Sequence, residues 1–270
     1  MLKQRILTAA WLAPLALAGL FGLDGGAFAL FAGAIVLLAG REWAHLAGVT
    51  TSLGRGLTLA GLAGVLLALW FGGAARASWP LVLGALGWAL NLYWVSRYPA
   101  AVTQWQTTSR RLVMGFCVLV PCWVGFNVLR ASEPGGVWLL FVLLLTWAAD
   151  IGAYFTGRAF GRRKLAPAVS PGKSWEGVMG GMVATALLAL VFAAWQSLGA
   201  AAAALLLAAT AGVTLVSVLG DLLESMLKRH CGIKDSSNLL PGHGGVLDRI
   251  DSLTAAVPVF ALFYLQVLAL

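Results

Sequence analysis

Charged residues are scarce in this sequence. Only 10% of its 270 residues are Asp, Glu, Lys or Arg, whereas 60% are hydrophobic. A soluble domain carries about 25% charged residues, so this chain cannot cover itself with a water-facing surface. The composition therefore excludes an ordinary soluble domain and favours a polytopic, helical membrane protein.

Cysteines and internal repeats are also scarce. The three cysteines, Cys117, Cys122 and Cys231, form neither a disulfide framework nor a spaced zinc motif. The sequence shows no inverted internal repeat of the kind found in many transporters. These features argue against a disulfide scaffold, a zinc-binding domain and the repeat-built transporters.

Long apolar runs follow one another along the whole chain. Each matches the roughly 20 residues that cross a bilayer as a helix, and we predict an all-α fold with nine spans. The spans cover residues 6–23, 26–46, 56–73, 79–96, 112–129, 136–154, 174–198, 200–223 and 253–270. The first run resembles a signal peptide with a cleavage site at Ala27–Ala29. Because that site lies inside the next apolar run, we predict an uncleaved helix.

The distribution of positive charge predicts the orientation. Cytoplasmic loops of membrane proteins accumulate Lys and Arg. With the N-terminus in the cytoplasm and nine spans, only Arg76 and Arg130 of the 18 basic residues lie outside, which leaves 16 inside. We therefore predict a cytoplasmic N-terminus and an external C-terminus.

The acidic residues are concentrated in the second half of the chain. Seven of the 10 lie at or after Asp150. We predict that residues 1–130 form a scaffold of about five helices. Residues 131–270 would form a catalytic half of about four helices with two cytoplasmic loops, in one folding unit. Glu42, near the end of the second span, is expected to pair locally with Arg41 or His45.

The first polar cluster surrounds residues 150–177. Asp150, Tyr154 and Arg158 are spaced by four and share one helical face. An acid within a span is costly and indicates function, although an Asp–Arg or Asp–Tyr pair for helix packing is the alternative. Further on, Ser170 is predicted to cap a helix that begins at Pro171.

A helix that begins at this point offers an anion site. Free backbone amides and the positive end of the helix dipole attract phosphate, and Lys173 adds a charge beside Ser174. The string Gly172-Lys173-Ser174 is not a nucleotide P-loop, because that motif needs a glycine five residues before the Gly-Lys pair. Position 167 is proline.

Two pairs of acids predict a metal–phosphate site. Asp221 and Glu224 are three residues apart, as are Asp248 and Asp251. Mg²⁺ takes oxygen ligands and shares its coordination with water and substrate phosphates. Zinc is disfavoured because His243 and Cys231 lack nearby partners at ligand spacing. The alternative for each pair is a salt bridge to nearby basic residues: Arg229, Lys234 and Arg249.

The segment from Ser225 to Asp251 resembles the signature of the bacterial phosphatidate cytidylyltransferases (CDP-diacylglycerol synthases). The fixed positions of that pattern are filled by Ser225, Lys228, Arg229, Lys234, Asp235, His243, Gly244, Gly245, Asp248, Arg249 and Asp251. The strings SPGKSWEG at 170–177, GDLLES at 220–225 and Arg41-Glu42-Trp43 are also similar to the family. The resemblance covers the whole chain.

The resemblance implies that CTP and phosphatidate react to CDP-diacylglycerol and pyrophosphate in the bacterial inner membrane. The expected partners are CTP, phosphatidate, the bilayer and a second copy of the chain in a homodimer, with no nucleic acid. A phosphate oxygen of phosphatidate would attack the α-phosphorus of CTP. Because this oxygen is already anionic near neutral pH, catalysis needs charge neutralisation and positioning rather than a strong general base. The rival interpretations are a polyprenol kinase, an archaeol cytidylyltransferase or a transporter of a phosphorylated solute.

Roles for individual residues follow from this mechanism. Asp221 and Asp248 are the expected leading Mg²⁺ ligands, and Glu224 and Asp251 are secondary ligands. The remaining catalytic candidates are Lys173, Lys228, His243 and Arg249. Substrate contacts are expected from Arg158, Arg162, Ser170, Ser174, Arg229, Lys234, Gly244 and Gly245.

Overall fold

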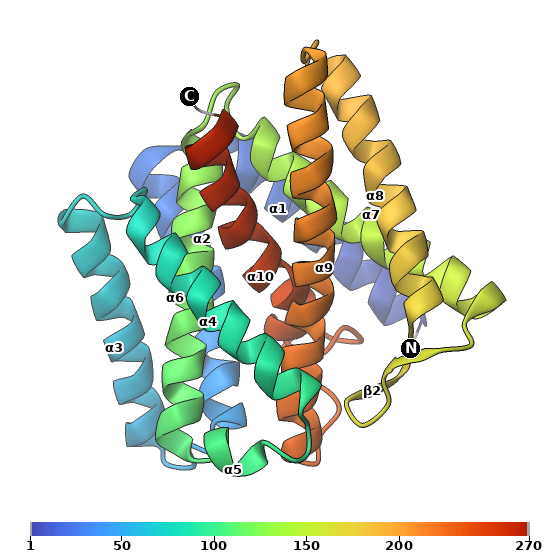
Figure 1. Ribbon diagram of the computed structural model, residues 1–270. Coiled ribbons are helices and arrows are strands. Elements are labelled where there is room, and N and C mark those ends of the chain that lie inside the picture. Colours follow the sequence, from blue (N-terminus) through green and yellow to red (C-terminus); the bar gives the residue numbers. More distant parts are fainter. Residues whose placement is uncertain (1, 269–270) are drawn as a thin grey trace.

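A computed structural model describes residues 2–268 of the chain. Helices dominate it, with one small hairpin of strands (Figure 1). The elements are α1 (Leu2–Gly22), α2 (Gly25–Leu46), α3 (Ser52–Phe71), α4 (Ser78–Ser96), α5 (Val102–Trp105), α6 (Thr108–Ala131), α7 (Val137–Phe160), β1 (Lys164–Ala166), β2 (Ser170–Ser174), α8 (Trp175–Trp195), α9 (Ala200–His230), α10 (Leu247–Phe263) and η1 (Tyr264–Leu268).

The helices account for the predicted spans in their predicted order. Within residues 2–268, seven helical segments are long and apolar enough to cross a membrane: α2, α3, α6, α7, α8, α9, and α10 continued by η1. The first and fourth predicted spans are also helices, α1 and α4. The all-α polytopic fold is confirmed, whereas the number of nine spans and the orientation of the termini stay predictions.

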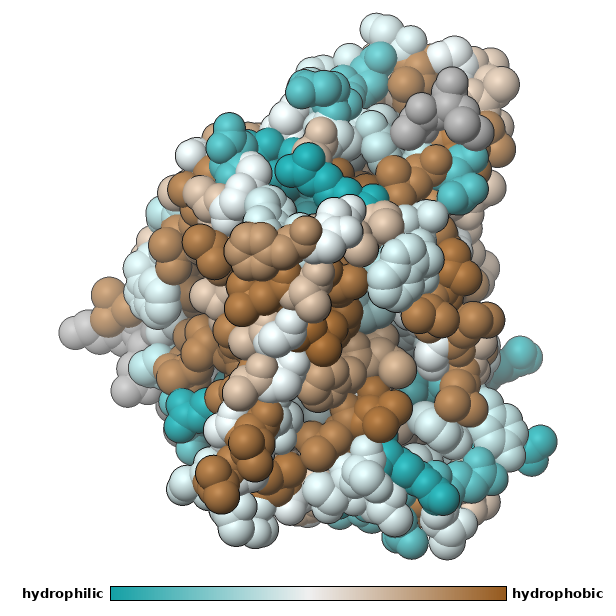
Figure 2. Space-filling model, turned by 90° about the vertical axis from the view of Figure 1, so that its left-hand side faces the viewer, coloured by the Kyte–Doolittle hydropathy of each residue, from teal (hydrophilic) through white to brown (hydrophobic). Residues whose placement is uncertain are grey.

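The outer surface is hydrophobic over a broad area. Figure 2 shows apolar side chains across the middle of one face, with hydrophilic ones toward its top and bottom. Phe71 at the end of α3 is 82% exposed, and Leu57 and Leu86 are 64% exposed. Such large exposed apolar areas are costly in water, so this surface fits the hydrocarbon interior of a bilayer.

Helices α6 and α10 lie at the centre of the bundle. Helix α10 packs against α2, α4 and α6 on one side and against α7 and α9 on the other (Figure 1). Its Val257 and Phe260 are fully buried, as is Val124 of α6. Helix α10 is therefore held between the helices of both halves of the chain.

Helix α9 is longer than a bilayer requires. Its 31 residues correspond to about 46 Å at 1.5 Å per residue, against a hydrocarbon core of about 30 Å. About 20 residues counted from Ala200 are enough to cross that core. Asp221 and the residues that follow it in α9 therefore reach the membrane boundary or pass beyond it.

The segment around Lys173 differs from the prediction. Ser170–Ser174 is strand β2, which pairs antiparallel with β1 through Ala166 opposite Ser170 and Lys164 opposite Ser174. The predicted helix start at Ser170 is wrong, because the backbone there pairs with β1 instead. Helix α8 begins at Trp175, and its N-cap is Ser174, whose Oγ accepts a hydrogen bond from Gly177 N at 3.1 Å.

Candidate active site

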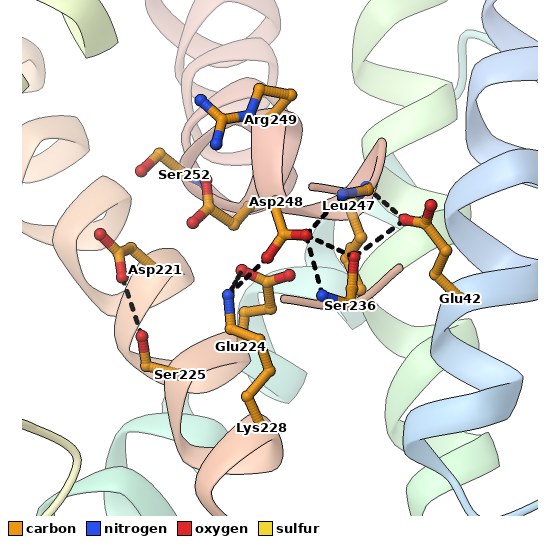
Figure 3. A network of polar contacts seen from close by, with 12 residues as sticks. Glu42, Asp221, Glu224, Ser225, Lys228, Ser236, Leu247, Asp248, Arg249 and Ser252 are labelled. Carbon is orange, nitrogen blue, oxygen red and sulfur yellow. Dashed lines mark hydrogen bonds and ion pairs between the residues drawn. The ribbon is translucent and has the colours of Figure 1, made fainter. Parts of the chain in front are cut away.

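A partly buried lysine contacts one acid of each pair. Lys228 Nζ lies 2.8 Å from Glu224 Oε2 on the same helix and 2.6 Å from Asp248 Oδ1 at the start of α10 (Figure 3). The three side chains are only 13%, 2% and 6% exposed, respectively. Two carboxylates thus share one cation in a poorly solvated place, where removal of the lysine would take the cation from both of them.

The second oxygen of Asp248 is held by the loop that precedes α10. Asp248 Oδ2 accepts hydrogen bonds from Ser236 N at 2.9 Å, Ser236 Oγ at 2.7 Å and Gly245 N at 2.7 Å. With Lys228 on the other oxygen, the carboxylate has donors on both sides. Its position is therefore fixed by the loop as well as by α9.

The two glycines after His243 give these carboxylates room. Gly244 has a φ of 79°, and a Cβ there would lie 2.7 Å from Asp248 Oδ2. A Cβ on Gly245 would collide with Ser236 Oγ and would lie 2.5 Å from Glu42 Oε2. Larger side chains would thus displace the network, and this is a structural reason for Gly-Gly. The predicted contact of these glycines with substrate stays a prediction.

A polar cavity lies beside this network. It measures about 370 Å³ and is lined by residues of α7, β2, α8 and α9, including Asp150, Arg158, Lys173 and Asp221. Lys173 Nζ lies 2.7 Å from Asp221 Oδ2, and both side chains are about a quarter exposed, at 25% and 29%. The structure therefore brings the helical face of Asp150 and Arg158 to the lysine of the hairpin.

Asp221 lines the cavity and belongs to the same helix as Lys228. It is one helical turn before Glu224, and its Oδ1 accepts a hydrogen bond from Ser225 Oγ at 3.1 Å (Figure 3). Asp251 belongs to the same neighbourhood, because a Cβ on Gly220 would collide with the Asp251 carbonyl oxygen. Helices α9 and α10 thus approach each other closely where the two acid pairs lie.

The acids of the site bear on the predicted metal. Within residues 2–268, no three His, Cys, Asp or Glu side chains form a ready group of metal ligands. However, Glu224 Oε1 is buried and has no hydrogen-bond partner, and Mg²⁺ is usually held by one or two carboxylates plus water and phosphates. The one free carboxylate oxygen is compatible with such an ion, and Mg²⁺ at these acids stays a prediction.

Other predicted site residues hold the surrounding structure. Arg249 is exposed, points away from Lys228 (Figure 3), and donates from Nε to the His243 carbonyl at 2.9 Å. The Nδ1 atom of His243 is buried and has no hydrogen-bond partner. Arg229 Nε donates to the Val169 carbonyl at 3.3 Å and so ties α9 to the hairpin.

The remaining predicted contacts are spread over the hairpin and the loop. Arg158 Nη1 donates to Tyr154 Oη at 3.1 Å at the edge of the cavity. Arg162 is exposed, and its backbone N–H donates to Glu176 Oε2 at 3.1 Å. Lys234 is exposed in the loop after α9. None of these arrangements tests the predicted substrate contacts.

Glu42 of α2 is the residue whose role the sequence did not reveal. The expected pair with Arg41 or His45 is wrong: Glu42 is 4% exposed, and its carboxylate accepts hydrogen bonds from the segment around the start of α10 instead. Its donors are Ser236 Oγ, Ser237 Oγ, Val246 N and Leu247 N. An acid in an apolar span was a signal of function, but partners about 200 residues away are not visible in sequence.

Comparison with known proteins identifies the family. The model of the cytidylyltransferase family matches residues 3–267. The chain belongs to this family. It is 51% identical to a phosphatidate cytidylyltransferase of Pseudomonas aeruginosa, with 97% of this chain and 96% of the relative covered.

Two further cytidylyltransferases extend the comparison. The identity is 43% to the phosphatidate cytidylyltransferase of Haemophilus influenzae, over 99% of this chain and all of the relative. It is 39% to that of Brucella suis, over 97% and 93%. The resemblance inferred from the segment 225–251 is therefore confirmed over nearly the full length.

Proposed function

We propose that this protein transfers the cytidylyl group of CTP to phosphatidate, giving CDP-diacylglycerol and pyrophosphate. Its membership in the cytidylyltransferase family and the names of its full-length relatives support this activity. The structural observation that carries the proposal is the network of Lys228, Glu224 and Asp248 beside a polar cavity, in a bundle whose exterior is apolar.

The proposed reaction needs little acid–base chemistry. A phosphate oxygen of phosphatidate forms a bond to the α-phosphorus of CTP. The bond between the α-phosphorus and the oxygen that bridges it to the β-phosphorus breaks, and pyrophosphate leaves with that oxygen. The attacking oxygen is already anionic near neutral pH. The main task is to hold two highly charged molecules in line, and positive groups preorganised in a site perform it.

Residues around the cavity can supply this positive charge. Lys173 and Arg158 line it, and Lys228 lies about two turns farther along α9 than Asp221. We assign the triphosphate to the lysines and the lipid phosphate to Arg158 and Arg162. Lys173 would exchange its contact with Asp221 for a phosphate oxygen, because both side chains are partly accessible.

We further propose that Mg²⁺ serves the reaction. Asp221 and Asp248 are the leading ligands, with Glu224 and Asp251 as secondary ligands or orienting groups. The buried and unpartnered Glu224 Oε1 supports a cation in this place. When bound, the ion supplies charge neutralisation for the triphosphate and the leaving pyrophosphate.

An apolar groove next to the polar cavity supports a lipid substrate. The groove measures about 610 Å³ and is lined by α4, the hairpin, α8 and α9, with Leu92, Val169 and Leu215 among its residues. Val178 and Val218 line both the groove and the polar cavity. A molecule with a charged head and an apolar tail matches this adjacency better than a soluble phosphorylated metabolite does.

The location and assembly of the protein complete the proposal. Its bacterial relatives and its apolar helices support a multi-pass protein of a bacterial membrane, and we assign it to the inner membrane with the site on the cytoplasmic side, where CTP is found. A homodimer remains part of the proposal. A polyprenol kinase, an archaeol cytidylyltransferase or a solute transporter are the rival functions.

One assay separates these functions. Purified protein should release pyrophosphate from CTP only when phosphatidate and a divalent metal are both present, and CDP-diacylglycerol should accumulate in equal amount. Full activity after thorough chelation would contradict the metal proposal. Turnover with a polyprenol but none with phosphatidate would move the protein to the rival enzymes, and no CTP-dependent turnover at all would refute a cytidylyltransferase.

A further inference from the structure

Glu42 makes four hydrogen bonds to one distant segment. Its Oε1 accepts from Ser237 Oγ at 2.6 Å and from Val246 N at 3.0 Å. Its Oε2 accepts from Leu247 N at 2.7 Å and from Ser236 Oγ at 3.1 Å. Val246 and Leu247 begin α10, so the carboxylate satisfies two backbone N–H groups that a helix leaves free at its N-terminus.

Ser236 links Glu42 to the buried acid of the site. Its hydroxyl has one proton to donate and lies between two acceptors, Glu42 Oε2 at 3.1 Å and Asp248 Oδ2 at 2.7 Å, which share it. Its backbone N–H donates to Asp248 Oδ2 at 2.9 Å (Figure 3). Glu42 thus accepts hydrogen bonds from two neighbours of Asp248. One is Leu247, which directly precedes Asp248 in α10, and the other is Ser236, which also donates to Asp248. None of the four donors to Glu42 belongs to α9, whereas Asp248 pairs directly with Lys228 of that helix.

We propose that Glu42 is a positioning residue for the proposed cytidylyl transfer. It fixes the start of α10 and Ser236 from α2, and thereby keeps the Asp248 carboxylate on Lys228. This role of Glu42 rests on the proposed function only where turnover is measured, because the assay is cytidylyl transfer. Through Glu42, helix α2 of the N-terminal half of the chain would fix the position of Asp248 in the site.

The hydrogen-bond pattern makes glutamine a sharp test. A side-chain amide has one accepting oxygen and one donating NH₂ group. In Glu42→Gln, the NH₂ group replaces one of the two carboxylate oxygens. At the Oε1 position it would face the backbone N–H of Val246, and at the Oε2 position it would face that of Leu247. The hydroxyls of Ser236 and Ser237 can turn, but these backbone groups cannot accept. The substitution therefore keeps the shape of the side chain and must break the cap.

The first arm of the test measures turnover. Glu42→Gln should lower kcat by ~10- to 100-fold, the range for groups that orient a catalytic ligand. His45→Gln is the matched control, because His45 is exposed one turn farther along the same helix, and it should stay within about twofold of the wild type. In the background of Asp248→Asn, Glu42→Gln should cause no further loss, because effects transmitted through one residue are not additive.

The second arm measures hydrogen exchange and does not depend on turnover. Ser236 N and Gly245 N donate to Asp248, not to Glu42. Their exchange should accelerate at least ~10-fold in Glu42→Gln and stay unchanged in His45→Gln, because their protection requires Asp248 in place.

The two arms distinguish failure of this inference from failure of the proposed function. If the wild type lacks cytidylyl transfer, the proposed function fails, and the exchange arm still decides the role of Glu42. Unchanged exchange at Ser236 and Gly245 in Glu42→Gln would overturn the inference. So would a loss of kcat that merely follows the folded fraction, or one that adds fully to the loss in Asp248→Asn.

Discussion

At the scale of single residues, burial separates the two lysines of the site. Lys173 and its partner Asp221 are 25% and 29% exposed, whereas Lys228 with Glu224 and Asp248 is 13%, 2% and 6% exposed. An accessible ion pair contributes little to stability because water screens it. A buried one leaves costly unpaired charge when one member is removed. The two lysines should therefore respond differently to the same substitution.

Lys228→Met and Lys173→Met test this difference. We expect Lys228→Met to lower the free energy of unfolding by about 3–5 kcal/mol, because Glu224 and Asp248 lose their shared cation. Lys173→Met should cost no more than about 1 kcal/mol but should abolish most turnover if Lys173 binds phosphate. Thermal unfolding and kcat of the same detergent-purified samples measure both. Equal destabilisation by the two substitutions would contradict the conclusion that the Lys228 ion pairs are less accessible to water than the Lys173 ion pair.

Asp248→Asn tests the charge of the second acid. Turnover should fall at least ~100-fold, the lower range for loss of a key electrostatic contributor. The melting temperature should fall too, because the amide loses the ion pair with Lys228. Asp24→Asn is the control, because it makes the same change at an exposed acid at the start of α2. It should leave turnover and the melting temperature close to those of the wild type. A folded Asp248→Asn protein with near wild-type turnover would remove this residue from the site.

At the scale of elements, the cavity depends on the close packing of α7 against α8. A Cβ on Gly152 of α7 would lie 2.6 Å from the Gly180 carbonyl oxygen, and one on Gly181 of α8 would lie 2.9 Å from the Ala149 carbonyl oxygen. Small residues let helix backbones approach in this way, as is common in membranes. The two helices carry Asp150, Arg158 and Gly177 along the cavity, so their separation sets its width.

Gly152→Ala should therefore destabilise the protein and reduce turnover. The new methyl group meets backbone atoms, which cannot rotate away, and overpacking of this kind costs about 1–3 kcal/mol. Gly212→Ala in α9 is the matched control, since a Cβ there meets nothing within 4 Å. That change should be neutral or stabilising by up to ~1 kcal/mol. A Gly152→Ala protein as stable and active as Gly212→Ala would show that the helix contact is looser than in the structure.

Elements also show where prediction from sequence succeeds. Within residues 2–268, each of the nine predicted spans falls on a helix, because a membrane leaves few alternatives to a helix. The end of the last span, residues 269–270, lies outside the described residues. The hairpin was missed, since Ser170-Pro171 has the pattern of a helix start and the pairing with Lys164–Ala166 depends on the turn between them. The partners of Glu42 were missed because nothing local to Arg41 or His45 indicates a contact across 194 residues or more.

At the scale of the whole molecule, the charged side chains of the site gather toward one end of the bundle. The hairpin and the C-terminal end of α9 lie toward one end of the bundle, and the C-terminal end of α10 lies toward the other (Figure 1). Most of the charged site is therefore at one end, as a reaction between a soluble nucleotide and a lipid requires. The charge distribution predicts that this end faces the cytoplasm, with 16 of the 18 basic residues inside.

Thiol labelling tests this orientation. Single cysteines at exposed positions, Arg163→Cys, Asn238→Cys and Ala200→Cys, are placed in a chain whose three native cysteines have been replaced. An impermeant thiol reagent added to cells with an intact inner membrane should label position 200 and leave 163 and 238 unlabelled. After permeabilisation all three should react, which controls for accessibility. Moving positive charge across a membrane is costly, so the chain has little freedom to invert. Labelling at 163 or 238 before permeabilisation, with none at 200, would reverse the topology and place the cavity away from cytoplasmic CTP.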